Sequence, residues 1–558
     1  MINYIIKYTT FFLLFFHLLA YSKKYHFTSS DIKNIPARDI YGVLDKIATL
    51  HGLSYGHTGQ VSQIRSLGKD LLTTIIYIDD VPVSNFNSGL INLSSLSLDR
   101  IDNIVIDDSP AGSSSLAIYI CTKKYDTTVP VTEMVYRDAF YNHRNISMHL
   151  GQNFNEDTSF LLYAEITDYR DHRESSDNFK YPYQKQNYNL QINLPSIFFF
   201  KPVFEASYLK EDIFDLSLDS AQYKPEETRF LLKLNSDSGA DNKYVNTLSF
   251  INSHRNDHFD HDNRNFRIYD RFSYDDSKNS FLLNSQLDHY SYRDLRGETS
   301  FSLEPSYQRT FSSFSAYFKT FFLYSDFSRE SFSADIELDQ NLPLGFEITS
   351  EHSIFKGNYR ILDSVIESEY FQNEIYLGNN FNLPGISVSI NSGIDIIEYQ
   401  KNISKTFSGY LAKGVNRFSK SKLDLQIFSD LKLKIYFSHK FNSDMILNDP
   451  NSTVVTSLNF TKKYFKDNLD ISTTVLHKYS DFYIDYNNRQ IINNLGFNLR
   501  VKIIDLELFF GIDNIMKNKY DINNTTYILN EHYGYQTIQG YDMQRFDEIW
   551  GVRWIFRY

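Results

Sequence analysis

From about residue 130 to the C-terminus, apolar and polar residues alternate along stretches of roughly 10 to 14 residues, which polar segments separate. Examples are SFLLYAEITDY (159–169), SAYFKTFFLYS (315–325), ISVSINSGIDI (386–396) and LELFFGIDNI (506–515). A period of two places successive side chains on opposite faces of a β-strand. Alternation of this length, rich in Tyr and Phe, is typical of a transmembrane β-barrel.

The final residues, IWGVRWIFRY, show this alternation most clearly. Aromatic or large apolar side chains occupy every second position, and the positions between them include Arg553 and Arg557. We expect the first set to face lipid and the two Arg residues to face the lumen. Such a strand also resembles the signal that the outer-membrane barrel assembly machinery reads. The residues assigned to barrel closure and to this signal are Trp550, Val552, Trp554, Phe556 and Tyr558.

The segments between the alternating stretches predict the number of strands. The tripeptide NLP recurs three times between strand-like runs, and proline suits a turn because it donates no backbone hydrogen bond. Short periplasmic turns and long outer loops alternate in such barrels. The apolar residues Leu423, Leu431 and Phe437 all stand at odd-numbered positions, so we read 421–438 as one strand. With this reading, short turns and long loops alternate along the whole barrel, which then has about 22 strands. The NLP turns are then periplasmic (193–195, 341–343, 382–384), and the long polar segments are outer loops (168–186, 253–265, 356–368, 513–545).

Residues 30 to about 125 have a different pattern. The run PARDIYGVLDKIATLHGL has the apolar spacing of a helix, and the residues on its apolar face are Ile40, Val43, Leu44 and Ile47. Short β-like runs follow, namely VSQIRSL, TTIIYIDDVPV and LDRIDNIVI. We therefore predict a small α/β domain over residues 23–128 and a barrel over residues 129–558.

Residues 1–22 are predicted to be a signal peptide. The apolar run FFLLFFHLLA follows Lys7 and is too short to span a bilayer comfortably. Ala20 and Ser22 supply small residues at positions −3 and −1, which places cleavage after Ser22. We therefore expect an exported protein that resides in the bacterial outer membrane, and a short membrane anchor is the alternative reading of this segment.

Composition narrows the class of protein. The 46 Phe and 42 Tyr favour a membrane headgroup zone, while 22% charged residues exclude a helical membrane protein. A soluble β-sandwich or solenoid would use more turn residues than the 22 Gly and 12 Pro present. The net charge of −12 argues against nucleic-acid binding, and the single Cys121 excludes an internal disulfide. The sequence carries no P-loop, dinucleotide-binding glycine pattern, HExxH motif or nucleophile elbow, so we expect neither an enzyme nor a cofactor.

Five stretches of the N-terminal domain match a known family, and they are SDIKNIPARDIYGVLDKIATLHGL, SQIRSLG, TIIYIDDVPV, LDRIDNIVIDDSPAGSS and LAIYICTKK. They resemble the plug of TonB-dependent outer-membrane receptors. DNIMKNKY and GYDMQRFDEIWGVRWIFRY resemble the end of the barrel in the same family, and the middle of the chain matches only as a barrel pattern. The resemblance implies a mainly β fold, in which an antiparallel barrel of about 22 strands holds the α/β plug in its lumen.

The sequence departs from that family at several points. The predicted mature chain begins at Lys23, and KKYHFTSS does not resemble a Ton box, the segment of these receptors that pairs with TonB. The run of small residues expected after SPAGSS is missing. Ser66 and Asp80 replace two expected glycines. These departures concern coupling to TonB rather than the architecture.

Two sets of residues are candidates for specific roles. His254, His258 and His261 stand among carboxylates in the loop HRNDHFDHDN, and such side chains bind transition metals, although a solvated polar loop is the alternative. No firm metal site is assigned. In the plug, the resemblance implies structural roles for Arg65, which bonds within the plug or to the barrel wall, and for Asp79, which shapes a turn.

The resemblance implies an outer-membrane receptor or transporter for a ligand of the siderophore, cobalamin, glycan or peptide class. Two alternatives remain: a transport-inactive surface-binding or scaffold barrel without TonB coupling, and a passive porin. The expected partners are outer-membrane lipid, the barrel assembly machinery and a surface lipoprotein, while dependence on TonB is left open.

Overall fold

The computed structural model describes most of the chain between residues 24 and 557. The predicted signal peptide, residues 1–22, lies outside the described residues. The described residues are 24–47, 49–54, 62–67, 74–83, 93, 96–107, 116–125, 127–139, 143–155, 158–170, 182–215, 221–223, 226–237, 244–256, 262–276, 278–292, 295–311, 314–325, 331–341, 346–361, 364–383, 386–399, 414–441, 450–485, 488–515, 521–522, 526–530, 534–538, 541–542 and 547–557.

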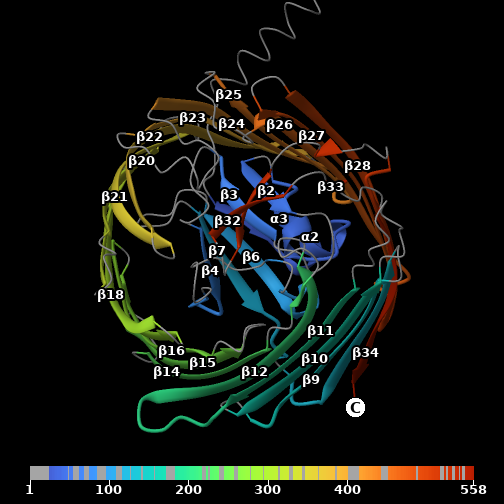
Figure 1. Ribbon diagram of the computed structural model, residues 1–558. Helices are drawn as coiled ribbons and strands as arrows, with labels where there is room; N and C mark the ends of the chain where they lie inside the picture. Colours follow the sequence, from blue (N-terminus) through green and yellow to red (C-terminus); the bar gives the residue numbers. More distant parts are fainter. Residues whose placement is uncertain are drawn as a thin grey trace, which may run out of the picture.

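Twenty-two antiparallel strands close into a barrel, which confirms the predicted fold class and strand number (Figure 1). Consecutive strands pair with each other, and β34 closes the ring by pairing with β29 on one side and β8 on the other. The barrel strands are β8 (Val131–Ala139), β9 (His143–Asn153), β10 (Ser159–Arg170), β11 (Pro182–Asn193), β12 (Phe200–Asp215), β14 (Glu226–Asp237), β15 (Tyr244–Asn256), β16 (Asp262–Asp275), β17 (Asn279–Tyr292), β18 (Leu295–Thr310), β19 (Phe314–Ser325), β20 (Ser331–Asn341), β21 (Phe346–Ile361), β22 (Ser364–Leu383), β23 (Ile386–Tyr399), β24 (Gly414–Ile427), β25 (Leu431–Lys440), β26 (Pro450–Tyr464), β27 (Leu469–Asp485), β28 (Asn488–Ile503), β29 (Leu506–Asp513) and β34 (Asp547–Arg557).

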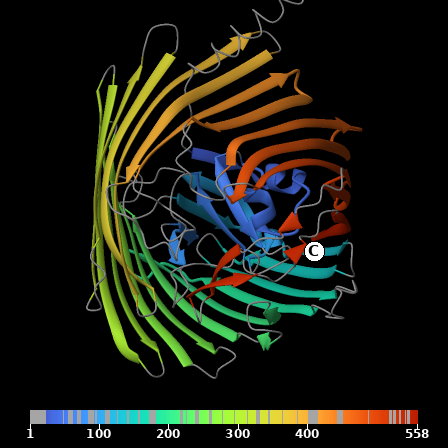
Figure 2. The same cartoon turned by 45° about the horizontal axis from the view of Figure 1, so that its top comes forward.

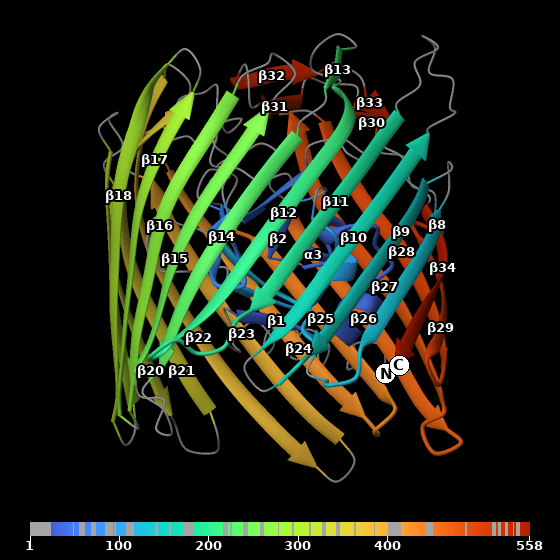
Figure 3. The ribbon, with the colours of Figure 1, turned by 90° about the horizontal axis from the view of Figure 1, so that it is seen from below.

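Short strands extend the barrel at the end opposite the C-terminus (Figure 3). β13 pairs with the end of β12. Two small antiparallel pairs, β31 with β32 and β30 with β33, lie between β29 and β34 in the sequence. Their strands are β13 (Ala221–Tyr223), β30 (Asp521–Ile522), β31 (Thr526–Asn530), β32 (Gly534–Ile538) and β33 (Tyr541–Asp542).

The connections alternate between the two ends of the barrel. The three NLP tripeptides follow β11, β20 and β22, all of which run toward the end where the chain finishes. The long polar segments follow β10, β15, β21 and β29, which run toward the opposite end. Both placements agree with the expectation from the sequence.

The prediction of one strand over 421–438 was wrong, because the chain turns between β24 and β25. Phe428 begins this turn with a φ of 60°. Ile427 pairs with Leu431 and Leu425 with Leu433, so the odd-numbered residues of both strands share one face. A turn of three residues, 428–430, therefore keeps the apolar residues at odd-numbered positions on both sides. The alternation of apolar and polar residues does not distinguish such a hairpin from one long strand.

The outer face of the barrel is apolar. Large side chains on alternate strand positions are strongly exposed there, for example Ile146 at 51%, Ile375 at 59% and Trp554 at 51%. An apolar belt of this extent would cause aggregation in water, whereas lipid covers it in a bilayer. None of the helices in the described part of the chain has the length and apolarity that a membrane crossing requires.

The N-terminal domain lies inside the lumen as a plug (Figure 2). Its main sheet has the strand order β1-β6-β7-β4-β5, in which only β4 and β7 are parallel, and β2 and β3 form a separate hairpin. The elements are β1 (Lys24–Phe27), α2 (Ser29–Asn34), α3 (Ile40–Leu44), β2 (Leu50–Ser54), β3 (Ser62–Ser66), β4 (Thr74–Ile78), β5 (Val81–Val83), η3 (Leu98–Arg100), β6 (Ile101–Asp107) and β7 (Leu116–Thr122).

Helix α3 and the residues after it form the centre of the plug core. Its predicted apolar face, Ile40, Val43, Leu44 and Ile47, is fully buried. Helix α2 was not predicted, although Thr28 and Asp31 form the reciprocal hydrogen bonds of a capping box at its start. Two wall residues, Tyr436 and Val455, belong to the same apolar cluster, so the plug core continues onto the barrel wall.

Gly551 allows the closing strand to pass close to its neighbours. A Cβ atom at this position would overlap the backbone oxygen of Tyr136 and the ring of Phe509, whereas a Cβ at Gly511 on β29 would lie 3.4 Å from its nearest neighbour, Pro36. Gly551→Ala should therefore reduce the folded fraction of the barrel, and Gly511→Ala should leave it nearly unchanged. Heat-modifiable migration in SDS gels measures this fraction. Equal folded fractions for the two variants would contradict the close approach at Gly551.

Candidate functional site

Ion pairs join the plug to the barrel wall. Each pairs a charged plug residue with an opposite charge on a strand or strand end, and the pairs involve strands β8, β12, β16, β25, β27 and β29. They are Asp31–Lys434 (2.9 Å), Asp45–Lys478 (2.7 Å), Lys46–Asp513 (2.9 Å), Asp80–Arg271 (2.5 Å), Asp99–Arg137 (2.5 Å), Arg100–Glu205 (2.9 Å) and Lys123–Glu133 (2.7 Å).

Asp99 is the most completely buried member of this set, with a side chain that is 0% exposed. Its carboxylate accepts hydrogen bonds from Arg137 on β8 at 2.5 Å, from the Ser147 hydroxyl on β9 at 2.9 Å and from Arg553 on β34 at 3.3 Å. Burial alone would raise the pKa of Asp99, but the guanidinium groups of Arg137 and Arg553 hold it below its usual value. One plug carboxylate thus contacts three consecutive strands across the closure of the barrel.

A second carboxylate, Glu133 on β8, binds the end of the plug. Lys123 donates to it at 2.7 Å and the Tyr125 hydroxyl at 2.8 Å, while Arg553 Nε lies 3.4 Å from it. Burial lowers the pKa of Lys123, and the positive charge of Arg553 lowers it further. The carboxylates of Glu133 and Asp99 raise the pKa and offset part of this effect. Arg553 therefore lies between both carboxylates and links the last strand to the plug.

Asp79 and Asp80 form the tight turn between β4 and β5. Their φ values are 48° and 67°, the left-handed region that this two-residue turn requires and that Asp tolerates better than most residues. The Asp79 carboxylate accepts from the Thr122 amide at 2.9 Å and the Thr122 hydroxyl at 2.6 Å, and Lys233 donates to the Asp79 backbone oxygen. Asp80, at one of the two positions where the resemblance leads us to expect glycine, pairs with Arg271 on β16.

The other predicted residues lie apart from these contacts or outside the described part. Arg65 lies in β3 opposite His51, and its side chain is outside the described residues. His254 lies in β15 and is half-buried, while His258 and His261 lie outside the described residues. Within the described residues, no three His, Cys, Asp or Glu side chains are grouped closely enough to hold a metal ion.

The closing strand presents different residues to its two sides. Trp550 and Trp554 are 45% and 51% exposed on the outer face, whereas Arg553 is 3% exposed and reaches the plug. Val552 and Phe556 are half-buried, and Tyr558 lies outside the described residues. Arg557 pairs with Asp505 at the C-terminal end of the barrel rather than with the plug.

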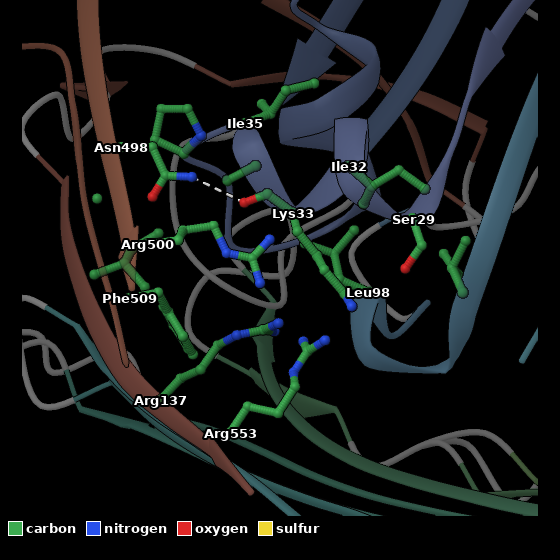
Figure 4. A pocket seen from close by; sticks show the side chains of 15 residues that line it. Ser29, Ile32, Lys33, Ile35, Leu98, Arg137, Asn498, Arg500, Phe509 and Arg553 are labelled. Atoms are coloured by element: carbon green, nitrogen blue, oxygen red, sulfur yellow. Dashed lines mark hydrogen bonds between the residues drawn. The ribbon is translucent and has the colours of Figure 1, made fainter. Parts of the chain in front are cut away.

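A cavity of about 50 Å³ lies between helix α2 and the strands that meet at the closure (Figure 4). Figure 4 shows Lys33 from the plug and three wall arginines, Arg137, Arg500 and Arg553, converging on it. A second cavity of about 30 Å³ shares Leu98, Arg137 and Ile549 with the first. Unfilled space at the plug–wall boundary is therefore present beside the Asp99 contacts.

Sequence reasoning found only part of this site. It predicted that Arg553 faces the lumen but did not assign Asp99, which lies 454 residues away in the chain. The sequence feature that could have indicated this contact is the inward-facing Arg553, because a buried Arg on a closing strand requires an anion inside the barrel. LDRID, in which Asp99 stands, was recognised as part of a strand-like run and of a plug-like stretch, but no role was assigned to Asp99.

A 22-stranded barrel closed around a folded N-terminal plug defines a fold class, the plugged outer-membrane barrels. No family model matches the sequence, and no curated protein sequence matches it. Three solved structures show the similarity in fold. A mutant of the ferric enterobactin receptor PfeA from Pseudomonas aeruginosa has a TM-score of 0.74 at 11% identity, over 96% of this chain and 98% of that chain. The siderophore receptor PirA from Acinetobacter baumannii has a TM-score of 0.73 at 10% identity, over 96% and 98%. The FrpB iron transporter from Neisseria meningitidis has a TM-score of 0.69 at 11% identity, over 96% and 99%. The resemblance to TonB-dependent receptors is thus confirmed at the level of the fold.

Asp99→Asn should loosen the plug, because it leaves Arg137 and Arg553 buried without their shared anion. Breaking one side of a buried ion pair costs about 3–5 kcal/mol, so amide hydrogen exchange in β6 and β7 should accelerate on the order of 100-fold or more. Asp102→Asn is the matched control, since Asp102 is exposed at the start of β6. Equal exchange in both variants would contradict the role assigned to Asp99.

Proposed function

We propose that this protein is an outer-membrane receptor that binds a ligand at the outer end of the barrel and admits it when the plug moves. The observation that carries the proposal is that the contacts between plug and wall are mainly polar. Among the described residues, seven ion pairs and a series of hydrogen bonds join them, while the buried apolar clusters that plug and wall share include four wall residues, Leu231, Ile251, Tyr436 and Val455. Water replaces polar contacts at lower cost than apolar ones, so such a plug is able to shift without exposing a hydrophobic core.

The geometry of the lumen supports this function over a passive porin. The plug sheet lies inside the lumen (Figure 2), and ion pairs reach the plug both from β8, β12 and β16 and from β25, β27 and β29. A barrel of this strand number would otherwise leave a wide aqueous channel. We therefore propose that the seated plug closes the channel.

An iron–siderophore complex is our first candidate ligand. The support is the fold, since the similar solved structures are named as a ferric enterobactin receptor, a siderophore receptor and an iron transporter. Cobalamin, glycans and peptides are the further candidates from the sequence. We propose lipid and the barrel assembly machinery as partners, the latter through the terminal strand, and a surface lipoprotein as a further partner.

A TonB-independent binding or scaffold barrel is the second candidate, and the position of β1 favours it. Residues 24–27 pair with β6 at the edge of the plug sheet. The Tyr25 side chain is 1% exposed, donates or accepts a hydrogen bond with Thr49 at 2.8 Å, and packs edge-on against Tyr436 of the wall. This segment is therefore held in the plug rather than presented to TonB.

Uptake tests the first candidate. Cells that lack their own siderophore receptors and express this chain should accumulate radioactive iron from ferric enterobactin, and accumulation should require TonB. Surface binding without accumulation would reject transport and favour the second candidate. Neither binding nor accumulation would reject ferric enterobactin as the ligand.

Capture of TonB separates the two candidates directly. The mature chain from Lys23, immobilised in detergent, should retain the C-terminal domain of TonB if it is an energised transporter. Because β1 is docked in the plug, the unmodified chain should capture TonB weakly. Tyr25→Ser should increase capture several-fold, because this change removes the buried ring that anchors β1. Absence of capture by both forms, beside a Ton-box receptor that does capture TonB, would contradict energised transport.

A further inference from the structure

Every charged side chain that lines the cavity of about 50 Å³ is a cation. These are Lys33 on α2 of the plug, Arg137 on β8, Arg500 on β28 and Arg553 on β34 (Figure 4). The remaining lining is apolar apart from Ser29 and Asn498, and Asn498 donates to the Lys33 backbone oxygen at 2.8 Å. A cavity of this size holds several ordered waters or one small polyatomic ion.

Carboxylates next to the cavity neutralise only part of this charge. Asp99 is shared by Arg137 and Arg553, Glu507 pairs with Arg500, and Glu133 pairs with Lys123. Asp470 also acts on Arg500 electrostatically. When Lys33 is protonated, five cations therefore stand against four carboxylates, and the excess positive charge lies in a poorly hydrated region, where an uncompensated charge is costly.

Unused hydrogen-bond donors lie at the same place. Arg553 is 3% exposed, and its Nη1 has no hydrogen-bond acceptor among the described residues. Its Nε lies 3.4 Å from a Glu133 oxygen but makes no hydrogen bond within the same residues. The Lys33 ammonium likewise has no hydrogen bond or ion pair within the described part of the chain. Burial, together with the charges of Arg553, Lys123 and Arg500, lowers the pKa of Lys33 to about 6. The site thus offers donors from both domains, and no carboxylate is among the described residues that line it.

We propose that this cavity binds a small inorganic oxyanion, of the phosphate or sulfate class, between Lys33 of the plug and Arg553 of the closing strand. Charge-assisted hydrogen bonds from guanidinium and ammonium groups suit the several oxygens of such an ion. Because the donors come from the plug and from the wall, the ion bridges them. A bound oxyanion therefore stabilises the seated plug by mass action, and movement of the plug breaks the site.

Sulfate is the test probe, because it does not titrate near neutral pH. Calorimetric titration of the full-length protein in detergent, with ionic strength held constant by chloride, should show one saturable site. Lys33→Gln should weaken sulfate binding at least tenfold, and Lys33→Arg should retain it within about threefold. Lys124→Gln is the matched control, since Lys124 is an exposed plug lysine away from the cavity, and it should leave the affinity unchanged. No binding above chloride, or equal binding by Lys33→Gln, would overturn the proposal.

A crystallographic measurement covers the case in which Lys33→Gln does not fold. Crystals of the unmodified protein soaked in selenate should give an anomalous peak between Lys33 and Arg553. An empty cavity under saturating selenate, or a peak with bromide and none with selenate, would contradict an oxyanion site.

The pH dependence of sulfate binding gives an independent readout. A bound anion raises the pKa of Lys33 above its value in the empty cavity, so sulfate binding takes up a proton above pH 6. Affinity should therefore be level below pH 6 and fall by up to tenfold per pH unit above it, a slope that Lys33→Gln removes. The charged groups around Lys33 are Arg137 and Glu133 on β8, Arg500 on β28, Arg553 on β34, Lys123 after β7, and Asp99 in η3.

Discussion

The hydrogen bonds between β34 and β8 are the constraint on which the rest of this structure depends. A β-sheet in a bilayer has no water to satisfy a free edge, so the last strand must pair with the first. That pairing runs from Ile549–Ala139 to Arg557–Val131. Closing 22 strands in this way creates a wide lumen, and a wide lumen must be filled if the membrane is to remain a barrier. The plug is thus a consequence of closure.

The same closure organises the charges inside the barrel. Alternation places Trp550 and Trp554 toward lipid, so Arg553 between them necessarily points inward. A buried guanidinium requires anions, and Asp99 of the plug and Glu133 of the first strand supply them. The closing strand is therefore tied to the first strand by backbone hydrogen bonds and to the plug by charge. The cationic cavity beside this junction belongs to the same arrangement, since Arg137 and Arg553 contribute to both.

The sequence predicted those features that local pattern determines. Period-two alternation is local, so the barrel, the outward Trp residues and the sides of the NLP turns could be read directly. The helix at 40–44 was predicted for the same reason, from its apolar spacing. The error at 421–438 arose because a turn of three residues leaves the odd-numbered residues of both strands on the same face. Alternation shows only which face a residue occupies, so it gave no sign of the turn. Contacts between distant residues were beyond reach, because nothing near Asp99 indicates that Arg137 and Arg553, which are 38 and 454 residues away, converge on it.

We propose that the folded plug, held mainly by polar contacts, closes the barrel and is able to move without unfolding the wall. Single-channel recording of the full-length protein in a planar bilayer tests this claim most directly. A seated plug should give no steady current in buffer, and large, reversible openings should follow when moderate urea weakens the plug–wall contacts. Steady conductance of a wide pore in buffer alone would contradict it, because the plug would then not close the lumen.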